Sequence, residues 1–225
     1  MMQPSYVSPE QVMKDRADYA RKGIARGRSL VAMSYHDGIA IVAENPSNTL
    51  HKVSEIYDRI GFAGVGRYNE FDQLRIAGIR HADMKGFAYS REDVDARSLA
   101  NQYAQILGQT FTNEMKPMEV EILVAEIGDG PEDDQMFHIL YDGTVDDESG
   151  FTVLGGDASA IAERMAEGFD VDRPLSAAIF AARTALAGPD RELEADDLEV
   201  AVLSRSNGRR TFKRIIGDEL IGHLG

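Results

Sequence analysis

The sequence "SLVAMSYHDGIAIVAE", residues 29–44, decides the fold of this chain. It consists of two apolar runs, each of strand length, on either side of Asp37-Gly38. An Asp-Gly pair between two such runs is the strongest short-range signal for a β-hairpin. We therefore predict that the folded core begins with a hairpin.

Further strands come in hairpin runs, and pairs of helices separate these runs. The other segments with strand character are residues 52–66, 119–128, 136–145, 151–157, 198–205 and 211–215. The segments with helical periodicity are residues 67–84, 90–114, 158–169, 174–188 and 217–225. Strands that follow one another in hairpins favour antiparallel sheets. We predict an α+β fold of one domain, residues 1–225, in which two mainly antiparallel sheets pack face to face and a helix pair covers each outer side.

A polar helix is predicted ahead of the first hairpin, over residues 9–22. Ser8 is a good N-cap, Pro9 suits the first helical position, and Gln11 completes a Ser-x-x-Gln capping box. Gly23 is expected to end the helix. An apolar stripe at helical spacing contains Met13, Ala17, Ala20 and Ile24, with Tyr19 beside it. The stripe predicts that one narrow face of this helix packs against another surface.

Composition excludes several classes of function. The 225 residues carry a net charge of −14, which argues against nucleic-acid binding because phosphate contacts need clustered Lys and Arg. The absence of cysteine removes disulfides, thiolate nucleophiles and Cys-ligated metal sites. Five scattered His residues show no metal spacing, so neither a metal nor a cofactor is expected. No signal peptide and no apolar run of membrane-span length is visible, and we expect a cytoplasmic protein with no membrane partner.

Six stretches of the chain resemble one protein family, the α-type subunits of actinobacterial proteasomes. They are "SPEQVMKDRADYARKGIARGRS" (8–29), "AENPSNTLHKVSEIYDRIGFAGVGRYNEFDQLRIAGIRHAD" (43–83), "SLANQYAQILGQTFT" (98–112), "KPMEVEILVAE" (116–126), "YDGTVDDE" (141–148) and "LEVAVLSR" (198–205). Their order and spacing span nearly the whole chain, which makes the resemblance specific. It implies a four-layer α/β/β/α sandwich of the Ntn-hydrolase type over residues 29–225, in agreement with the layers predicted from the pattern.

The resemblance also implies an assembly. Subunits of this family form a homo-heptameric α-ring that caps rings of catalytic β-type subunits in the 20S core particle. The α-ring gates substrate entry and receives the C-terminal tail of an activator, either a ring ATPase or an ATP-independent protein, for degradation of tagged intracellular proteins. This chain is therefore expected to be a non-catalytic subunit of a threonine-type endopeptidase complex.

Two alternatives stay open. In the first, the chain is itself an active Ntn hydrolase, which needs an N-terminal Thr, Ser or Cys whose free α-amine acts as the base. Ser29 is the nearby candidate, but cleavage before it would remove the capped helix. The family's catalytic carboxylate falls about at Glu44 and its catalytic lysine near Thr49, which cannot stabilise a nucleophile by charge. In the second alternative, the chain is a small-molecule-binding module that forms no ring.

The resemblance assigns the gate to the start of the chain, residues 1–8. Pro9 matches the proline of the family's gating turn, and Tyr19 matches the tyrosine of its "YAR" motif. The expected gate residues are Met1, Met2, Gln3, Pro4, Ser5, Tyr6, Val7, Ser8, Pro9 and Tyr19. The Tyr-Asp that usually lies further upstream is missing, so this gate is expected to close by a different arrangement from that of archaeal and eukaryotic relatives.

The expected activator-binding site contains three residues. Lys52 matches the family's pocket lysine, which receives the terminal carboxylate of the activator, and Gly66 lies where the family's backbone donor lies. Arg26 is expected to supply a second cation. A carboxylate tail needs a cation and free backbone N–H groups, and a lysine beside a glycine-rich turn offers both. Without the resemblance, Lys52 would be interpreted as a solvated lysine at a strand edge.

Overall fold

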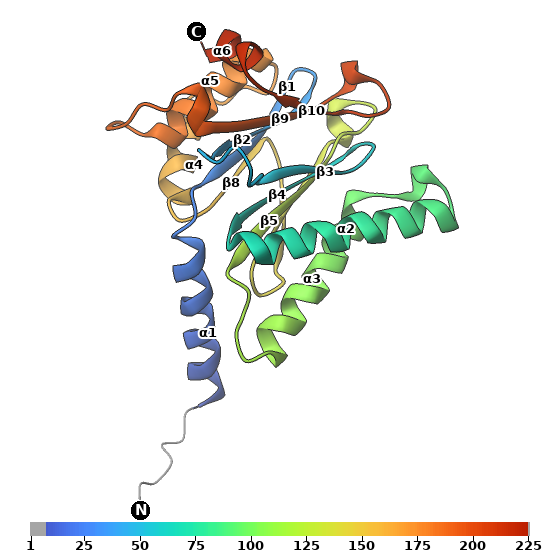
Figure 1. Cartoon of the computed structure of the whole chain (residues 1–225), viewed down its shortest axis with the longest axis vertical. Coiled ribbons are helices and arrows are strands. Elements are labelled where there is room, and N and C mark those ends of the chain that lie inside the picture. The colour runs from blue at the N-terminus through green and yellow to red at the C-terminus, as the bar shows by residue number, and fades with distance from the viewer. Residues whose placement is uncertain (1–7, 225) are drawn as a thin grey trace, which may run out of the picture.

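Two five-stranded antiparallel sheets stack face to face at the centre of the molecule (Figure 1). The computed structural model describes residues 8–224. Strand order is β10-β9-β2-β1-β8 in the first sheet and β3-β4-β5-β6-β7 in the second. The strands are β1 Leu30–Tyr35, β2 Gly38–Glu44, β3 Val53–Tyr57, β4 Ile60–Gly66, β5 Val120–Glu126, β6 Gln135–Ile139, β7 Val145–Glu148, β8 Phe151–Leu154, β9 Leu198–Ser204 and β10 Phe212–Ile215. The predicted antiparallel sheets are confirmed.

The hairpin predicted from residues 29–44 is present and forms the centre of the first sheet. Leu30 lies opposite Ala43, and Tyr35 lies opposite Gly38, so two residues form the turn. Every residue of both strands is buried. This follows from their position, because one face of the sheet packs on the other sheet and the opposite face packs under helices.

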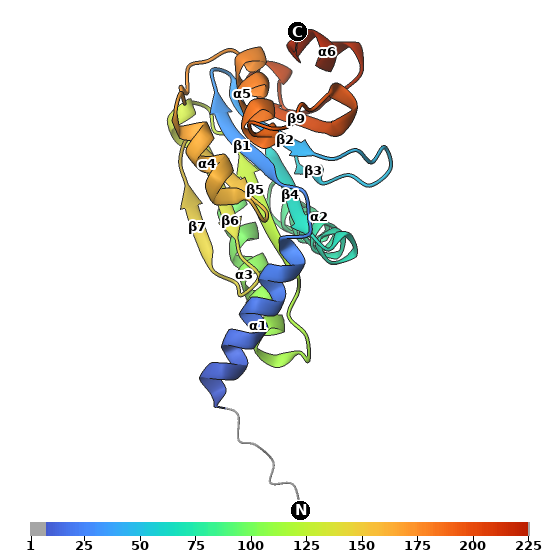
Figure 2. The same cartoon turned by 90° about the vertical axis from the view of Figure 1, so that its left-hand side faces the viewer.

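Helices cover the outer face of each sheet, and Figure 2 shows these layers from the side. The helices α2 (Tyr68–Ala88) and α3 (Ala96–Asn113) pack on the second sheet, whereas α4 (Ala158–Ala166) and α5 (Leu175–Ala187) pack on the first. The short helix α6 (Asp218–Leu224) lies against α5. The four-layer α/β/β/α sandwich is confirmed. Within residues 8–224, no helix combines the length and the apolar character that a bilayer span requires.

The N-terminal helix α1, Pro9–Ile24, extends away from the sandwich (Figure 1). It ends two residues later than predicted. Gly23 does not stop it and instead serves a close contact: a Cβ there would overlap the side chain of Glu119, just before β5. The glycine therefore lets the helix approach the second sheet.

The predicted N-cap of α1 is confirmed, and the capping box is half formed. The Ser8 hydroxyl accepts a hydrogen bond from the backbone N–H of Gln11 at 3.2 Å. The side chain of Gln11 donates to Asp15 at 2.7 Å instead of reaching back to the Ser8 backbone. One of the unpaired N–H groups at the start of the helix is thus satisfied by Ser8.

Candidate functional site

Residues 26–28, directly after α1, are where the predicted activator-binding residues meet. The Lys52 ammonium donates to the carbonyl oxygen of Arg28 at 2.5 Å. A Cβ placed on Gly27 would lie 2.9 Å from the backbone nitrogen of Gly66, so β4 passes directly beside this segment. Arg26 itself is exposed. The structure therefore places Lys52 and Gly66 against one short segment that begins with Arg26.

Gly66 ends β4 in a conformation that favours glycine. Its φ is +108°, and a Cβ there would overlap the carbonyl oxygen of Glu119. The same carbonyl accepts a hydrogen bond from the backbone N–H of Arg67 at 2.9 Å. A side chain at position 66 would force apart the start of β5 and the exit from β4, so glycine is required there by both conformation and space.

Lys52 is half-buried, and its surroundings change its titration. Burial lowers the pKa of its ammonium group to about 8, because desolvation disfavours the charged form. The carboxylates of Glu199 and Glu44 act in the opposite direction, and the guanidinium of Arg28 adds to the lowering. Lys52 therefore stays mostly charged at neutral pH but loses its charge far below the usual range for lysine.

A cavity of about 370 Å³ opens beside this segment. Its charged lining residues are Arg26, Arg28, Glu44, Asp157, Arg164 and Arg191. Glu44 is 4% exposed and accepts from both terminal nitrogens of Arg191, at 2.9 and 3.0 Å, and from Arg28. Burial raises the pKa of Glu44, but the bonds from Arg191 and Arg28 outweigh it and hold that pKa below its usual value. Glu44 therefore ties two arginines together.

Arg28 and Arg191 pair with Glu44, whereas within residues 8–224 no carboxylate lies within ion-pair distance of Arg26 or Arg164. Arg164 donates to the carbonyl oxygen of Ala185 at 2.8 Å, and Arg26 is exposed. An exposed guanidinium without a carboxylate partner keeps its donors available for an anion from outside the chain.

A larger cavity, about 980 Å³, lies at the opposite end of the sheets, between the β3–β4 turn and the β9–β10 loop. It is lined by opposite charges that pair with one another, such as Arg91 with Asp58 at 2.6 Å. Of the predicted site residues that lie within residues 8–224, none lines it. The volume of a cavity alone therefore does not identify the functional site. The predicted activator-binding residues meet at residues 26–28, beside the smaller cavity.

The residues considered for a catalytic alternative do not form a hydrolase site. Ser29 is 7% exposed and follows directly after α1 and its connecting segment. Glu44 is engaged by two arginines, and Thr49 is exposed in the loop between β2 and β3. Ser29 would need removal of the whole of α1 before it could offer a free amine.

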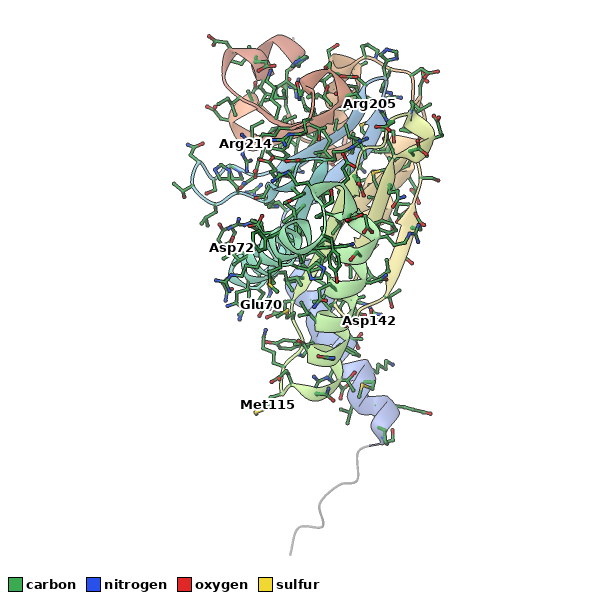
Figure 3. All side chains as sticks on the ribbon, turned by 90° about the vertical axis from the view of Figure 1, so that its right-hand side faces the viewer. Glu70, Asp72, Met115, Asp142, Arg205 and Arg214 are labelled. Carbon is green, nitrogen blue, oxygen red and sulfur yellow. The ribbon has the colours of Figure 1, made fainter. Side chains whose placement is uncertain are left out.

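Of the predicted gate residues, Met1, Met2, Gln3, Pro4, Ser5, Tyr6 and Val7 lie outside the described residues. Ser8 caps α1 and Pro9 is its first residue. The side chain of Tyr19 is 46% exposed, with the ammonium of Lys116 located 5.7 Å from its ring centroid. Figure 3 shows Met115, which is fully exposed, at the same end of the molecule as α1.

Sequence reasoning missed the network that holds Lys52. Glu199 on β9 accepts from the backbone of Lys52, from the amide of Asn45 and from Arg214, which Figure 3 labels near the β2–β3 loop. Two signals could have revealed it. One is a glutamate in the otherwise apolar "LEVAVLS". The other is the Asn-Pro-Ser turn, in which the side-chain oxygen Oδ1 of Asn45 accepts from the Ser47 N–H at 3.2 Å.

Comparison with known proteins gives one consistent family. The model of a family described as "Proteasome subunit" matches residues 24–203. A protein of Acidimicrobium ferrooxidans named "Proteasome subunit alpha" is 64% identical over 225 residues, which cover 100% of this chain and 97% of that protein. Proteins of the same name from Sanguibacter keddieii and Kineococcus radiotolerans are 56% and 54% identical, and the matches cover 98% and 100% of this chain and 88% and 98% of the relatives.

Proposed function

This chain belongs to the proteasome subunit family as an α subunit, the non-catalytic kind, and we propose that it forms the α-ring of a 20S core particle, gates substrate entry and docks activators. Seven copies would form the ring and stack on β-type subunits that carry the active sites. A ring ATPase or an ATP-independent activator would then insert its C-terminal tail. Because the chain is an α subunit, we abandon both alternatives, an active hydrolase built on Ser29 and a module that forms no ring. The cytoplasmic location stays a prediction.

The meeting of Lys52, Gly66 and Arg26 carries the docking proposal. They come from three separate parts of the sequence, yet Lys52 and Gly66 both lie against residues 26–28, the segment that begins with Arg26. A terminal carboxylate needs a positive charge and backbone donors at close range. Lys52 provides a charged ammonium beside this segment, and Arg26 provides a guanidinium that no carboxylate of residues 8–224 pairs with, on a chain of net charge −14. That combination supports capture of an anionic tail.

The exposed half of α1 supports a place in a ring. Val12 and Met13 are 40% and 38% exposed, and Met115, at the same end of the molecule as α1 (Figure 3), is fully exposed. Apolar side chains gathered at one end of a chain mark a surface for another protein. We propose that neighbouring copies of this chain cover them and that residues 1–8, which precede α1, form the gate.

The docking proposal is tested by Lys52→Ala in assembled particles of this chain and its β-type partner. Degradation of a folded protein with an activator present should fall, while hydrolysis of a short peptide by the bare particle should hold. Lys213→Ala is the matched control, because Lys213 is an exposed lysine on β10 paired with Glu219. If Lys52→Ala leaves both activities unchanged, the assignment of Lys52 is wrong.

The gate is tested by deletion of residues 2–7. Peptide hydrolysis without an activator should rise in these particles, because the barrier at the pore is removed. The β-subunit active sites are unchanged by this deletion, so equal rates before and after it would contradict a gate in this segment.

A further inference from the structure

Glu199 gathers hydrogen-bond donors around the backbone of Lys52. The carboxylate is 9% exposed on β9. One of its oxygens accepts from the Lys52 N–H at 2.7 Å and from the Asn45 amide at 2.8 Å. The other accepts from Arg214 at 2.6 Å and from the Val53 N–H at 3.2 Å. Consecutive backbone N–H groups on a single carboxylate fix the chain direction at that point.

The same network holds the rest of the loop between β2 and β3. The amide of Asn45 also donates to the carbonyl oxygen of Leu50 at 2.7 Å, and its backbone N–H donates to that of Asp197 at 2.7 Å. Arg214 donates to the carbonyl oxygen of Val53 at 2.5 Å. The loop is therefore tied at both ends to β9 and β10, across the edge of the first sheet.

Charges face the Lys52 ammonium from several elements. Glu199 on β9 and Glu44 at the end of β2 favour its charged form, and Arg28 ahead of β1 disfavours it. The imidazole of His51 lies 3.3 Å from Glu199. Of the two carboxylates, Glu199 acts more strongly on Lys52, whereas Glu44 is shared between two arginines. Burial disfavours the charged form of Lys52, so the nearby carboxylates determine the pH at which its ammonium group loses its proton.

We propose that Glu199 is the positioning residue of the docking site. It fixes the backbone from which Lys52 projects, and its charge keeps the ammonium protonated while a terminal carboxylate arrives. This inference rests on the proposed function of Lys52, and the test below separates the two.

The test measures how tightly a labelled peptide binds to assembled α–β particles between about pH 6 and about pH 9.5. The peptide is the C-terminal tail of an activator that drives degradation, and its C-terminal amide is the control. Only the charged ammonium binds a carboxylate strongly, so affinity of the wild type should fall as the pH rises through about 8. One pH unit above the pKa, the loss is about tenfold.

In Glu199→Gln particles, this fall should begin at a lower pH, and binding near pH 7 should weaken several-fold. Lys52→Met should bind weakly with no fall in this range. Glu55→Gln is the matched control, because Glu55 is a carboxylate on β3 held by Arg210. It should keep both the wild-type affinity and the wild-type pH dependence.

The outcomes separate the two ideas. Wild-type binding by Lys52→Met would overturn the proposed function. Weak binding by Lys52→Met together with a wild-type pH dependence for Glu199→Gln would overturn the role of Glu199. This holds even if Glu199→Gln binds the peptide more weakly, because a merely structural role would not shift the pH midpoint of binding. If Glu199→Gln particles do not assemble, Glu199→Asp decides. It should keep the wild-type midpoint and bind more weakly, and wild-type affinity in this variant would contradict positioning.

Discussion

The two halves of α1 belong to one helix but have different surroundings. Near its C-terminal end, Ala20 and Ile24 are 0% and 2% exposed and lie in the core between the sheets. Near its N-terminal end, Val12 and Met13 stay exposed. The apolar stripe runs through both halves. The spacing of apolar residues in the sequence therefore predicts a buried helix face, but it does not identify what covers that face. The sandwich covers one half, and we propose that a neighbouring subunit covers the other.

Arg16 lies between these halves and connects α1 to the C-terminal end of α3. It donates to the carbonyl oxygens of Phe111 at 2.6 Å, Thr110 at 3.3 Å and Glu114 at 2.5 Å. These carbonyls lie at the end of α3 and at its C-cap, Glu114, where a helix lacks partners of its own for most of its carbonyl groups. The carbonyl of Thr110 also accepts from the Glu114 N–H at 3.2 Å. A cation at a helix C-terminus also complements the helix dipole. The helix α1 therefore caps α3 through one side chain.

The largest effect on stability is expected from Ile24→Ala. Removal of a buried isoleucine leaves a cavity between α1 and the sheets and should lower the free energy of unfolding by about 2–4 kcal/mol. Urea unfolding followed by circular dichroism measures this change. Val12→Ala, at the exposed half, is the control and should change it by less than about 0.5 kcal/mol. Equal losses of stability in Ile24→Ala and Val12→Ala would contradict the conclusion that only the C-terminal half of α1 is packed in the core.

A smaller effect is expected from Arg16→Ala. The carbonyl groups at the end of α3 would lose a charged donor, and the free energy of unfolding should fall by about 1–3 kcal/mol. Urea unfolding again gives the value, and hydrogen exchange at the end of α3 should speed up. Arg16→Lys tests the geometry, because a single ammonium cannot reach all three carbonyls. Unchanged exchange at the end of α3 in Arg16→Ala would show that the cap is dispensable.

Ser8→Ala should have a modest effect confined to the first turn of α1. Loss of the hydroxyl acceptor for the Gln11 N–H should lower stability by about 0.5–1 kcal/mol. Amide exchange in the first turn should increase while exchange at Ile24 stays the same. Faster exchange along the whole helix would mean that its two halves unfold together.

The smallest effect on stability is expected from Met13→Gln, with a change of less than about 0.5 kcal/mol. The particle assembled with β-type subunits, measured by size-exclusion chromatography, should nevertheless form less completely, because the exposed stripe loses an apolar contact. Lys14→Gln, one residue along on the exposed helix, is the control. Normal assembly of Met13→Gln would contradict the proposal that a neighbouring subunit covers the exposed half of α1.

Short-range patterns in the sequence were sufficient for the layers of the fold. The apolar runs on either side of Asp37-Gly38 and the Ser8 cap act between residues a few positions apart, and the structure has both the hairpin and the cap. The role of Gly23 was not predictable in this way. A glycine after a basic last turn is typical of a helix end, and only the packed structure brings Glu119 against it.

The sequence by itself therefore determined the two sheets, their helix pairs, the N-terminal helix and the resemblance that points to Lys52. The tertiary structure alone decided which half of α1 is buried, that Lys52 and Gly66 share one segment, and that Glu199 holds Lys52. The reason is distance along the chain. Lys52 and Glu199 are separated by 147 positions, so no local propensity couples them. They meet because β9 lies beside β2 in the first sheet and the loop that follows β2 closes over its end.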